Sequence, residues 1–295
     1  MKSIIYKNKA PLLLFLTPAF AFMVVFLFYP FVMNIFNSFS TITGLGSAAS
    51  GLNSPWYENY VKLFSDSIMH TVLLNTTLLM LFTLVFQIGI ALLLALLVDS
   101  IKKGVQFFRT VYFFPIVISA TALGLLFNLI FLYDGGMINQ ILLGLGRKEL
   151  IDWKGENLYL FTMSFPVVWQ YVGFYFIILT TGLNNIPTDL YEACEIDGAN
   201  LPQRIRYITL PLLHNTLGTC LTLGITGALK VFDLPWVMMG AGMPMDKSWL
   251  LGTYMYNQTF LRGDVDYGST IALLIVVLGV VLSQLFNKFY KEKNY

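Results

Sequence analysis

Six long runs without Asp, Glu, Lys or Arg cross this sequence, and apolar residues dominate each of them. A helix needs about 20 such residues to span the hydrocarbon of a bilayer. Membrane barrels instead show strands of about ten residues with alternating polarity, and these runs do not alternate. The sequence therefore predicts an all-α integral membrane protein with six transmembrane helices. The runs are 11–33, 71–98, 110–133, 157–188, 207–229 and 267–287.

The composition excludes a soluble globule. Hydrophobic residues make up 57% of the chain and charged residues 12%, whereas soluble domains are about 45–50% apolar and about 25% charged. Two cysteines form no disulfide framework. A net charge of +2 is too weak to indicate a nucleic-acid partner. The expected solvent for most of this chain is the lipid bilayer.

Lys and Arg predict the orientation, because cytoplasmic loops are enriched in both. With the N-terminus inside, the inner segments hold eleven Lys and Arg, and the longer outer segments hold six. We therefore expect both termini in the cytoplasm and one transmembrane domain over 1–295. Its first helix is expected at about 11–36, and its core helices at about 71–98, 110–133, 158–181, 208–231 and 267–287.

The sequence lacks motifs for catalysis, metal binding and nucleotide binding. The two histidines, His70 and His214, cannot build a histidine metal cluster. The sequence holds neither a nucleophile elbow nor a phosphate-binding P-loop, so we predict no catalytic residue, no metal and no cofactor bound by this chain. Lys230 and Asp233, at the outer end of the fifth run, are the only ionisable candidates inside the membrane. Lys230 either reaches the outer interface or lines a pocket.

Aromatic, amide and glycine residues in the fourth and fifth runs are candidates for a solute path. Gln170 and Phe174 are four residues apart and share a helix face. Aromatic rings stack on sugar rings and amides bond hydroxyls, while glycine lets a ligand approach the backbone closely. The alternative is that all these residues pack between helices. The candidates are Trp169, Gln170, Phe174, Gly224, Gly227 and Phe232.

The inner loop at 182–208 predicts a helix, a turn and a second helix. Pro187 suits the first position of a helix, Gly198 suits the left-handed residue that ends one, and Asn200 can cap the next. The first helix carries no Lys or Arg, unlike a helix that rests on lipid. We therefore favour a helix that docks into a groove on a partner protein.

The same loop resembles the signature of permease subunits in binding-protein-dependent ATP-binding-cassette (ABC) importers. That signature is Glu-Ala-Ala, three residues, Gly, nine residues and Ile-x-Leu-Pro. Here Cys194 replaces the second alanine and both gaps match; Tyr29-Pro30, Phe107–Thr110 and Phe232-Asp233 resemble the carbohydrate branch. The positions concerned are Glu192, Ala193, Cys194, Asp197, Gly198, Ile208, Leu210 and Pro211.

The resemblance implies a type I ABC importer permease in a bacterial or archaeal plasma membrane. Its implied partners are a second permease chain, expected to be a different one, two ATPase subunits that bind ATP and Mg, and an extracytoplasmic solute-binding protein. The segment 186–206 is the implied coupling loop, where Glu192 and Gly198 transmit motion, and the implied cargo is a sugar or oligosaccharide. Another solute class, or an ATPase-independent secondary carrier, is the alternative.

Overall fold

The computed structural model describes residues 10–101, 104–240, 242–244 and 246–291. Helices make up its regular structure apart from one pair of two-residue antiparallel strands, β1 (Ser40–Thr41) and β2 (Gly51–Leu52). Within these residues, four helices are long and apolar enough to cross a membrane, and two bent helix pairs raise the number to six if each pair is one span. The four are Leu12–Ser38, Ser67–Asp99, Tyr159–Asn184 and Val265–Lys288.

The predicted span 110–133 is divided in the structure. It consists of α6 (Val105–Val117) and α7 (Ala120–Ile130), which meet at 90°. Ile118 adopts an extended backbone with ψ 135°, so the helical hydrogen-bond ladder stops there. The neighbouring helix satisfies the carbonyl released at this break, since Nε2 of Gln170 donates to it over 3.4 Å.

A second bend separates the inner loop from the fifth predicted span. The helical stretch Leu201–Leu212 comprises α11 (Leu201–Arg204), the π-helical turn η3 (Ile205–Thr209) and α12 (Leu210–Leu212). It meets α13 (His214–Leu229) at 67°. Pro211 lies just before the bend, and its missing N–H together with the wide turn before it explains why the helix axis changes here.

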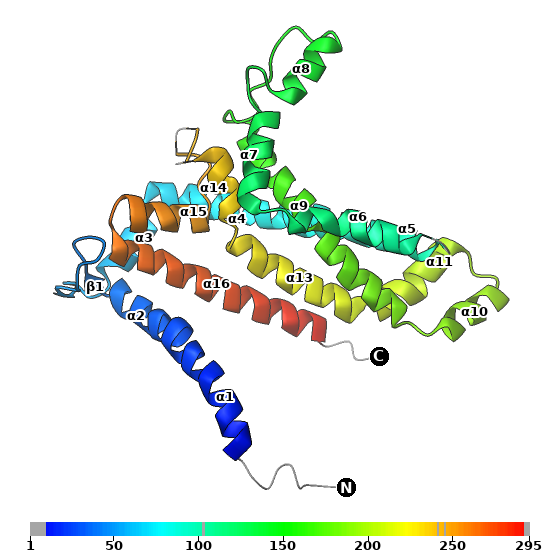
Figure 1. Cartoon of the computed structure of the whole chain (residues 1–295), viewed down its shortest axis with the longest axis horizontal. Coiled ribbons are helices and arrows are strands. Elements are labelled where there is room, and N and C mark those ends of the chain that lie inside the picture. The colour runs from blue at the N-terminus through cyan, green and yellow to red at the C-terminus, as the bar shows by residue number, and fades with distance from the viewer. Residues whose placement is uncertain (1–9, 102–103, 241, 245, 292–295) are drawn as a thin grey trace. The chain divides into compact units, whose positions relative to one another are not determined.

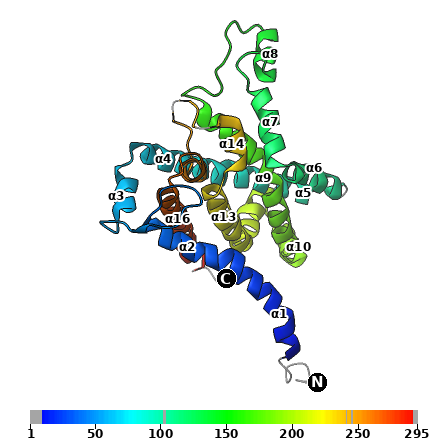
Figure 2. The same ribbon diagram turned by 60° about the vertical axis from the view of Figure 1, so that its left-hand side comes forward.

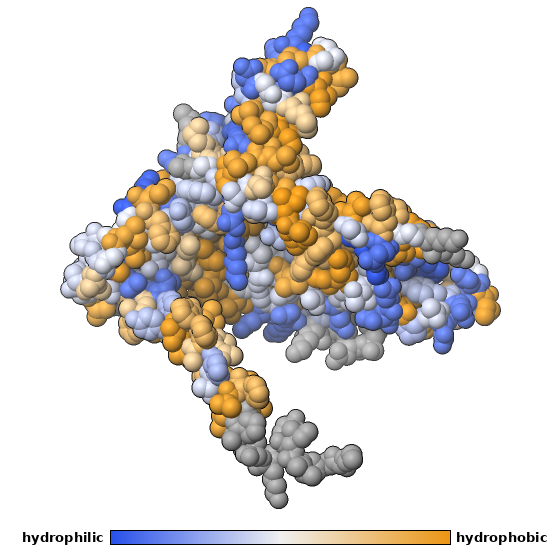
Figure 3. Space-filling model, viewed as in Figure 1, coloured by the Kyte–Doolittle hydropathy of each residue, from blue (hydrophilic) through white to orange (hydrophobic). Residues whose placement is uncertain are grey.

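The chain packs as two units, Met1–Asp66 with Met255–Leu274 and Ser67–Tyr254 with Ile275–Tyr295. In the first unit, Lys62 forms an ion pair with Asp264 at 2.5 Å, and the hydroxyl of Tyr267 donates to Asp66 over 2.7 Å. Its first helix, 12–38, is mostly apolar (Figure 3), and none of its most apolar stretch is buried. Its other elements are α1 (Ala10–Met23), η1 (Val24–Phe28), α2 (Tyr29–Ser38), α3 (Glu58–Ser65) and η4 (Asn257–Leu261).

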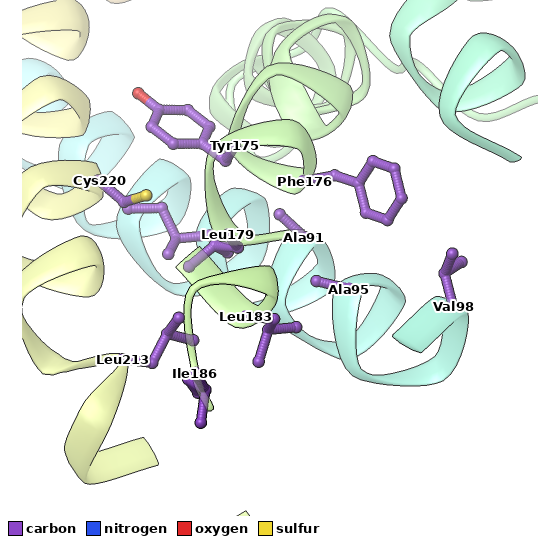
Figure 4. Close-up of a cluster of buried hydrophobic side chains, with 11 residues drawn as sticks. Ala91, Ala95, Val98, Tyr175, Phe176, Leu179, Leu183, Ile186, Leu213 and Cys220 are labelled. Carbon is purple, nitrogen blue, oxygen red and sulfur yellow. The ribbon is translucent and has the colours of Figure 1, made fainter. Parts of the chain in front are cut away.

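In the second unit, α9 (Tyr159–Asn184) packs against α5 (Ile88–Asp99), α6 and α13 (Figures 1 and 2). The small residues Ala91 and Ala95 of α5 are fully buried against Phe176 and Leu179 of α9 (Figure 4). Helices in lipid gain stability where small residues let their surfaces approach closely. The remaining elements are α4 (Ser67–Phe82), η2 (Thr83–Gln87), α8 (Met137–Gly144), α10 (Thr188–Ile196) and α14 (Asp233–Met239), with α15 (Leu251–Tyr256) and α16 (Val265–Lys291) shared between the units.

The backbones of α6 and α9 approach each other closely at Gly173. A Cβ atom added there would lie 1.8 Å from the carbonyl oxygen of Tyr112. Gly173→Ala must therefore push the two helices apart, and we expect the free energy of unfolding to fall by about 1–3 kcal/mol. The thermal unfolding midpoint of the detergent-solubilised protein measures this loss.

Gly89→Ala in α5 is the matched control, because nothing lies within 4 Å of its added Cβ. Alanine is the better helix former by up to about 1 kcal/mol, so this variant should unfold at the same temperature as the unaltered protein or higher. Equal midpoints for the Gly173 and Gly89 variants would show that the α6–α9 contact does not depend on Gly173.

Candidate functional site

A cavity of about 330 Å³ lies between α9 and α13, and we call it the α9–α13 cavity. Five of the six predicted path residues line it: Gln170, Phe174, Gly224, Gly227 and Phe232. The whole lining comes from four separate stretches of the sequence, 83–87, 120, 167–175 and 223–235, which meet at one hollow. The predicted face of α9, carrying Gln170 and Phe174, is the face that borders it.

Gln170 has a structural role as well as a place in the cavity wall. Its side chain is 4% exposed, and its amide is the donor to the Ile118 carbonyl at the break between α6 and α7. Phe174 is half-buried and packs edge-on against Tyr175, with ring centroids 5.2 Å apart. Of the two, Phe174 is the residue whose removal probes the cavity without disturbing the helix break.

Trp169 does not line the cavity. It is 39% exposed, and its ring packs edge-on against Phe127 at 5.6 Å. Successive helix residues point about 100° apart, so Trp169 and Gln170 face different neighbours. The prediction grouped them because they are adjacent in sequence and similar in chemistry.

The two predicted glycines differ in what surrounds them. A Cβ added to Gly224 would lie 2.8 Å from Leu84 and 3.3 Å from Ile88, so this glycine lets α13 approach η2 and α5. Nothing lies within 4 Å of a Cβ added to Gly227. Gly227 is therefore the glycine that borders open space.

Three cavity residues were not among the six predicted path residues, although a place in a pocket was one of the two alternatives for Lys230. Lys230 and Asp233 both line the cavity and are exposed, while Gln87 of η2 contributes a buried amide. Lys230 and Asp233 do not pair in the described part of the chain, because the backbone leaves the helix between them, with Phe232 at φ −140°. The only sequence feature that indicated a role for Gln87 was that it is a polar residue inside an apolar run. That feature does not show which way its side chain faces.

The ring of Phe232 stacks on that of Trp236 at 5.7 Å and 20°. The cavity wall contains three kinds of group. Aromatic rings come from α9 and from the segment just after α13, amide groups come from η2 and α9, and Lys230 and Asp233 add two charges of opposite sign. Such a lining suits a polar solute with apolar faces, since rings stack and polar groups form hydrogen bonds. Three-residue groups of His, Cys, Asp or Glu that could hold a metal do not occur among the described residues.

The inner loop has the predicted helix–turn–helix geometry. Gly198 has φ +77°, and two backbone bonds close the end of α10: Gly198 N–H to the Glu195 carbonyl at 3.2 Å and Ala199 N–H to the Cys194 carbonyl at 3.0 Å. Asn200 and Gln203 then form a reciprocal capping box, as such residue pairs do at helix starts. Pro187 lies one position before the helix rather than in its first position.

Side chains hold the two helices of the loop together. The guanidinium of Arg204 lies 4.7 Å from the ring centroid of Tyr191 and 3.6 Å from the carboxylate of Glu195. The Tyr191 hydroxyl is 3.3 Å from that of Thr209. At the base of the loop, Ile186 and Leu213 are buried in the same core cluster as the small residues of α5 (Figure 4).

The outer surface of the loop carries acids and apolar side chains. Glu192, Ala193 and Asp197 are exposed, and Cys194 is half-buried. Ile196 is 86% exposed, whereas isoleucine is usually buried in folded proteins. Ile208, Leu210 and Pro211 are half-buried where the loop joins α13.

Comparison with known proteins places this architecture in a family. The chain is 32% identical over 289 residues to a probable ABC transporter permease protein, YurN, of Bacillus subtilis (strain 168), covering 97% of each chain. It is 30% identical to the arabinooligosaccharides transport system permease protein AraP of the same organism, covering 96% of this chain and 89% of AraP. No protein-family model matches the sequence.

The fold is also that of a solved structure. A bacterial alginate ABC transporter, crystallised in complex with an alginate pentasaccharide-bound periplasmic protein, contains a chain that matches with a TM-score of 0.82 at 20% identity. The match covers 96% of this chain and 94% of that one. The fold is that of a multi-pass membrane permease, and the chain belongs to the permease proteins of ABC transporters.

The turn at Gly198 can be tested by backbone strain alone, because nothing lies within 4 Å of an added Cβ. A left-handed conformation costs ordinary residues about 1–2 kcal/mol, so Gly198→Val should raise the opened population of the loop roughly five- to thirtyfold. Limited proteolysis of residues 186–206 in inside-out vesicles measures this population.

Gly198→Asn is the matched control, since asparagine tolerates the left-handed region. It should be cleaved at a rate closer to that of the unaltered protein. Equal cleavage of the valine and asparagine variants would contradict a strained turn at this position.

Proposed function

We propose that this chain is a membrane-spanning subunit of a sugar or oligosaccharide importer, and that the α9–α13 cavity forms part of the solute path. The observation that carries the proposal is the cavity lining, in which aromatic rings, buried amides and the open face at Gly227 meet. Arabinooligosaccharides and alginate, the cargoes named for two similar proteins, support the same solute class. Other solute classes are the alternative within the family.

A second permease chain, different from this one, completes the path in our proposal. An extracytoplasmic binding protein delivers the sugar at the outer loops, and the periplasmic protein in the alginate transporter structure supports such a partner. Two ATPase subunits bind ATP and Mg and supply the driving force. This chain itself binds no nucleotide or metal and performs no catalysis.

The proposed topology counts each bent helix pair as one span, which gives six transmembrane helices in one permease domain with both termini in the cytoplasm. The excess of Lys and Arg in segments 1–10, 99–109, 182–208 and 287–295 supports this orientation. It places α10 and α11 on the cytoplasmic side, where the ATPase subunits lie.

In this arrangement the coupling loop of this chain docks into a cleft on one of the two ATPase subunits. Glu192 supplies charge on the docked surface, and the exposed side chain of Ile196 supplies apolar contact. Gly198 sets the angle between α10 and α11. Closure of the ATPases has to favour one conformation of the permease over the other by several kcal/mol to switch which one is populated. The coupling loop connects the ATPases to the membrane helices, so their closure acts on the permease through this loop.

The solute path can be tested at Phe174. Losing one stacking ring costs about 0.5–1.5 kcal/mol, so Phe174→Ala should raise the half-saturating sugar concentration for uptake roughly two- to tenfold. Uptake of a panel of labelled neutral and acidic oligosaccharides is measured in cells that also produce the partner subunits. Assembly with the ATPase subunits should be unchanged, because Phe174 lies far along α9 from the coupling loop.

Phe161→Ala is the matched control on the same helix. Phe161 is 43% exposed and lies outside the α9–α13 cavity. Uptake that responds equally to both substitutions, or that ignores Phe174→Ala at limiting sugar, rejects the path. Import of a different solute class by the unaltered complex, with no sugar of the panel transported, rejects the sugar assignment itself.

The orientation is tested with single cysteines in a protein whose Cys194 and Cys220 are replaced by alanine. Ser65 and Gln140 are exposed in predicted outer segments, and Asp189 is exposed in the inner loop. An impermeant thiol reagent added to intact cells should label cysteines at the first two positions and leave the third unlabelled until the membrane is opened. Labelling of Asp189→Cys in intact cells would reverse the orientation.

A further inference from the structure

A second hollow lies where α9 meets α6. We call it the α6–α9 groove; its volume is about 390 Å³. Its walls are apolar at one end and polar at the other, and its lining contains no acidic residue. Residues Gln106, Arg109, Thr110, Phe113, Phe114, Val117, Ile177 and Thr181 line it.

Arg109 is the notable residue in this groove. Its side chain is half-buried, yet in the part of the chain that the structure describes it forms no ion pair. Partial burial of an unpaired charge is costly unless an anion or hydrogen-bond partners satisfy it. A guanidinium carries five donors in a planar fork that matches phosphate oxygens.

The rest of the groove matches the remainder of a lipid molecule. The exposed amide of Gln106 lies one turn before Arg109, and both belong to the inner end of α6. Toward the other end of α6 the lining becomes Phe113, Phe114 and Val117, and Val117 is 70% exposed. A polar head next to Arg109 and an acyl chain along these side chains would follow the same axis.

The groove is formed before any ligand binds, because the backbones of α6 and α9 touch at Gly173 and fix the spacing of its two walls. The proposed orientation places Arg109 at the cytoplasmic leaflet, where anionic lipids create a negative surface potential. By sequence, Lys102 and Lys103 add positive charge to the same segment. Basic pockets between transmembrane helices on this side are known to hold anionic headgroups.

We propose that the α6–α9 groove is a binding site for an anionic phospholipid, with its phosphate held by Arg109 and Gln106 and one acyl chain lying along Phe113, Phe114 and Val117. This site is separate from the solute path. It makes the lipid composition of the membrane a determinant of how firmly α6 stays attached to α9.

The test uses the purified complex of this chain with its partner subunits in nanodiscs of phosphatidylcholine. A trace of phosphatidylglycerol or phosphatidylcholine carries a photoactivatable group near its headgroup, and labelled peptides are identified by mass spectrometry. One basic residue near an anionic headgroup favours the anionic lipid roughly fivefold, so the α6 peptide should be labelled about that much more by phosphatidylglycerol.

Three variants locate the effect. Arg109→Gln should abolish the preference, and Arg109→Lys, which keeps the charge, should retain most of it. Arg147→Gln removes the same charge from an exposed residue outside the groove and should leave the preference unchanged. Because the two probes are compared within the unaltered complex as well, the result does not depend on how stable any variant is.

Several outcomes would overturn the site. Equal labelling by the two lipids, or an unchanged preference in Arg109→Gln, removes the anionic headgroup from the groove. Loss of labelling on adding millimolar inorganic phosphate would show that the site takes a free anion. A photoactivatable residue at Val117 that captures the second permease chain instead of lipid would make the groove a protein interface. Nanodiscs carry the same lipid in both leaflets, so none of these results depends on the orientation or on the transported solute.

Discussion

Every backbone polar group in the hydrocarbon of a membrane must find a partner inside the protein, since no water is present to satisfy it. This requirement explains why the described chain is mostly helical and why a side chain meets the carbonyl freed at the break between α6 and α7. At the bend between α6 and α7, the released carbonyl of Ile118 is met by Gln170. The same residue lines the α9–α13 cavity, so the helix break and the proposed solute path share Gln170.

Local signals predicted much of the architecture. Charge-free runs predicted the four long apolar helices at 12–38, 67–99, 159–184 and 265–288. Gly198 and Asn200 predicted the turn between α10 and α11. Both signals depend on neighbouring residues alone. The 90° bend at Ile118 was not predicted. The residues at the break, Ile118 and Ser119, include no glycine or proline, and hydropathy averaged over a run reports how long an apolar segment is but not where its axis turns.

The cavity was predicted in outline. Helical spacing identified the face of α9 that carries Gln170 and Phe174, whereas Trp169, a third candidate from this helix, lies outside the cavity. Gly224 and Gly227 have the same signal in the sequence, and only the positions of Leu84 and Ile88 show that the first serves helix packing. Gln87 and Lys230 border the cavity through the meeting of distant segments, which no local pattern encodes.

The continuity of α9 has a mechanical consequence. This helix runs without a break from Phe174 at the cavity to Asn184 beside the coupling loop, and ten residues at 1.5 Å each make a rod of about 15 Å. Ile186 and Leu213 clamp both ends of the loop to the base of that rod. A tilt of about 10° imposed at the loop therefore displaces the cavity wall by about 2.5 Å. In the proposed topology, a force applied to the loop by an ATPase would therefore reach the cavity through a continuous helix.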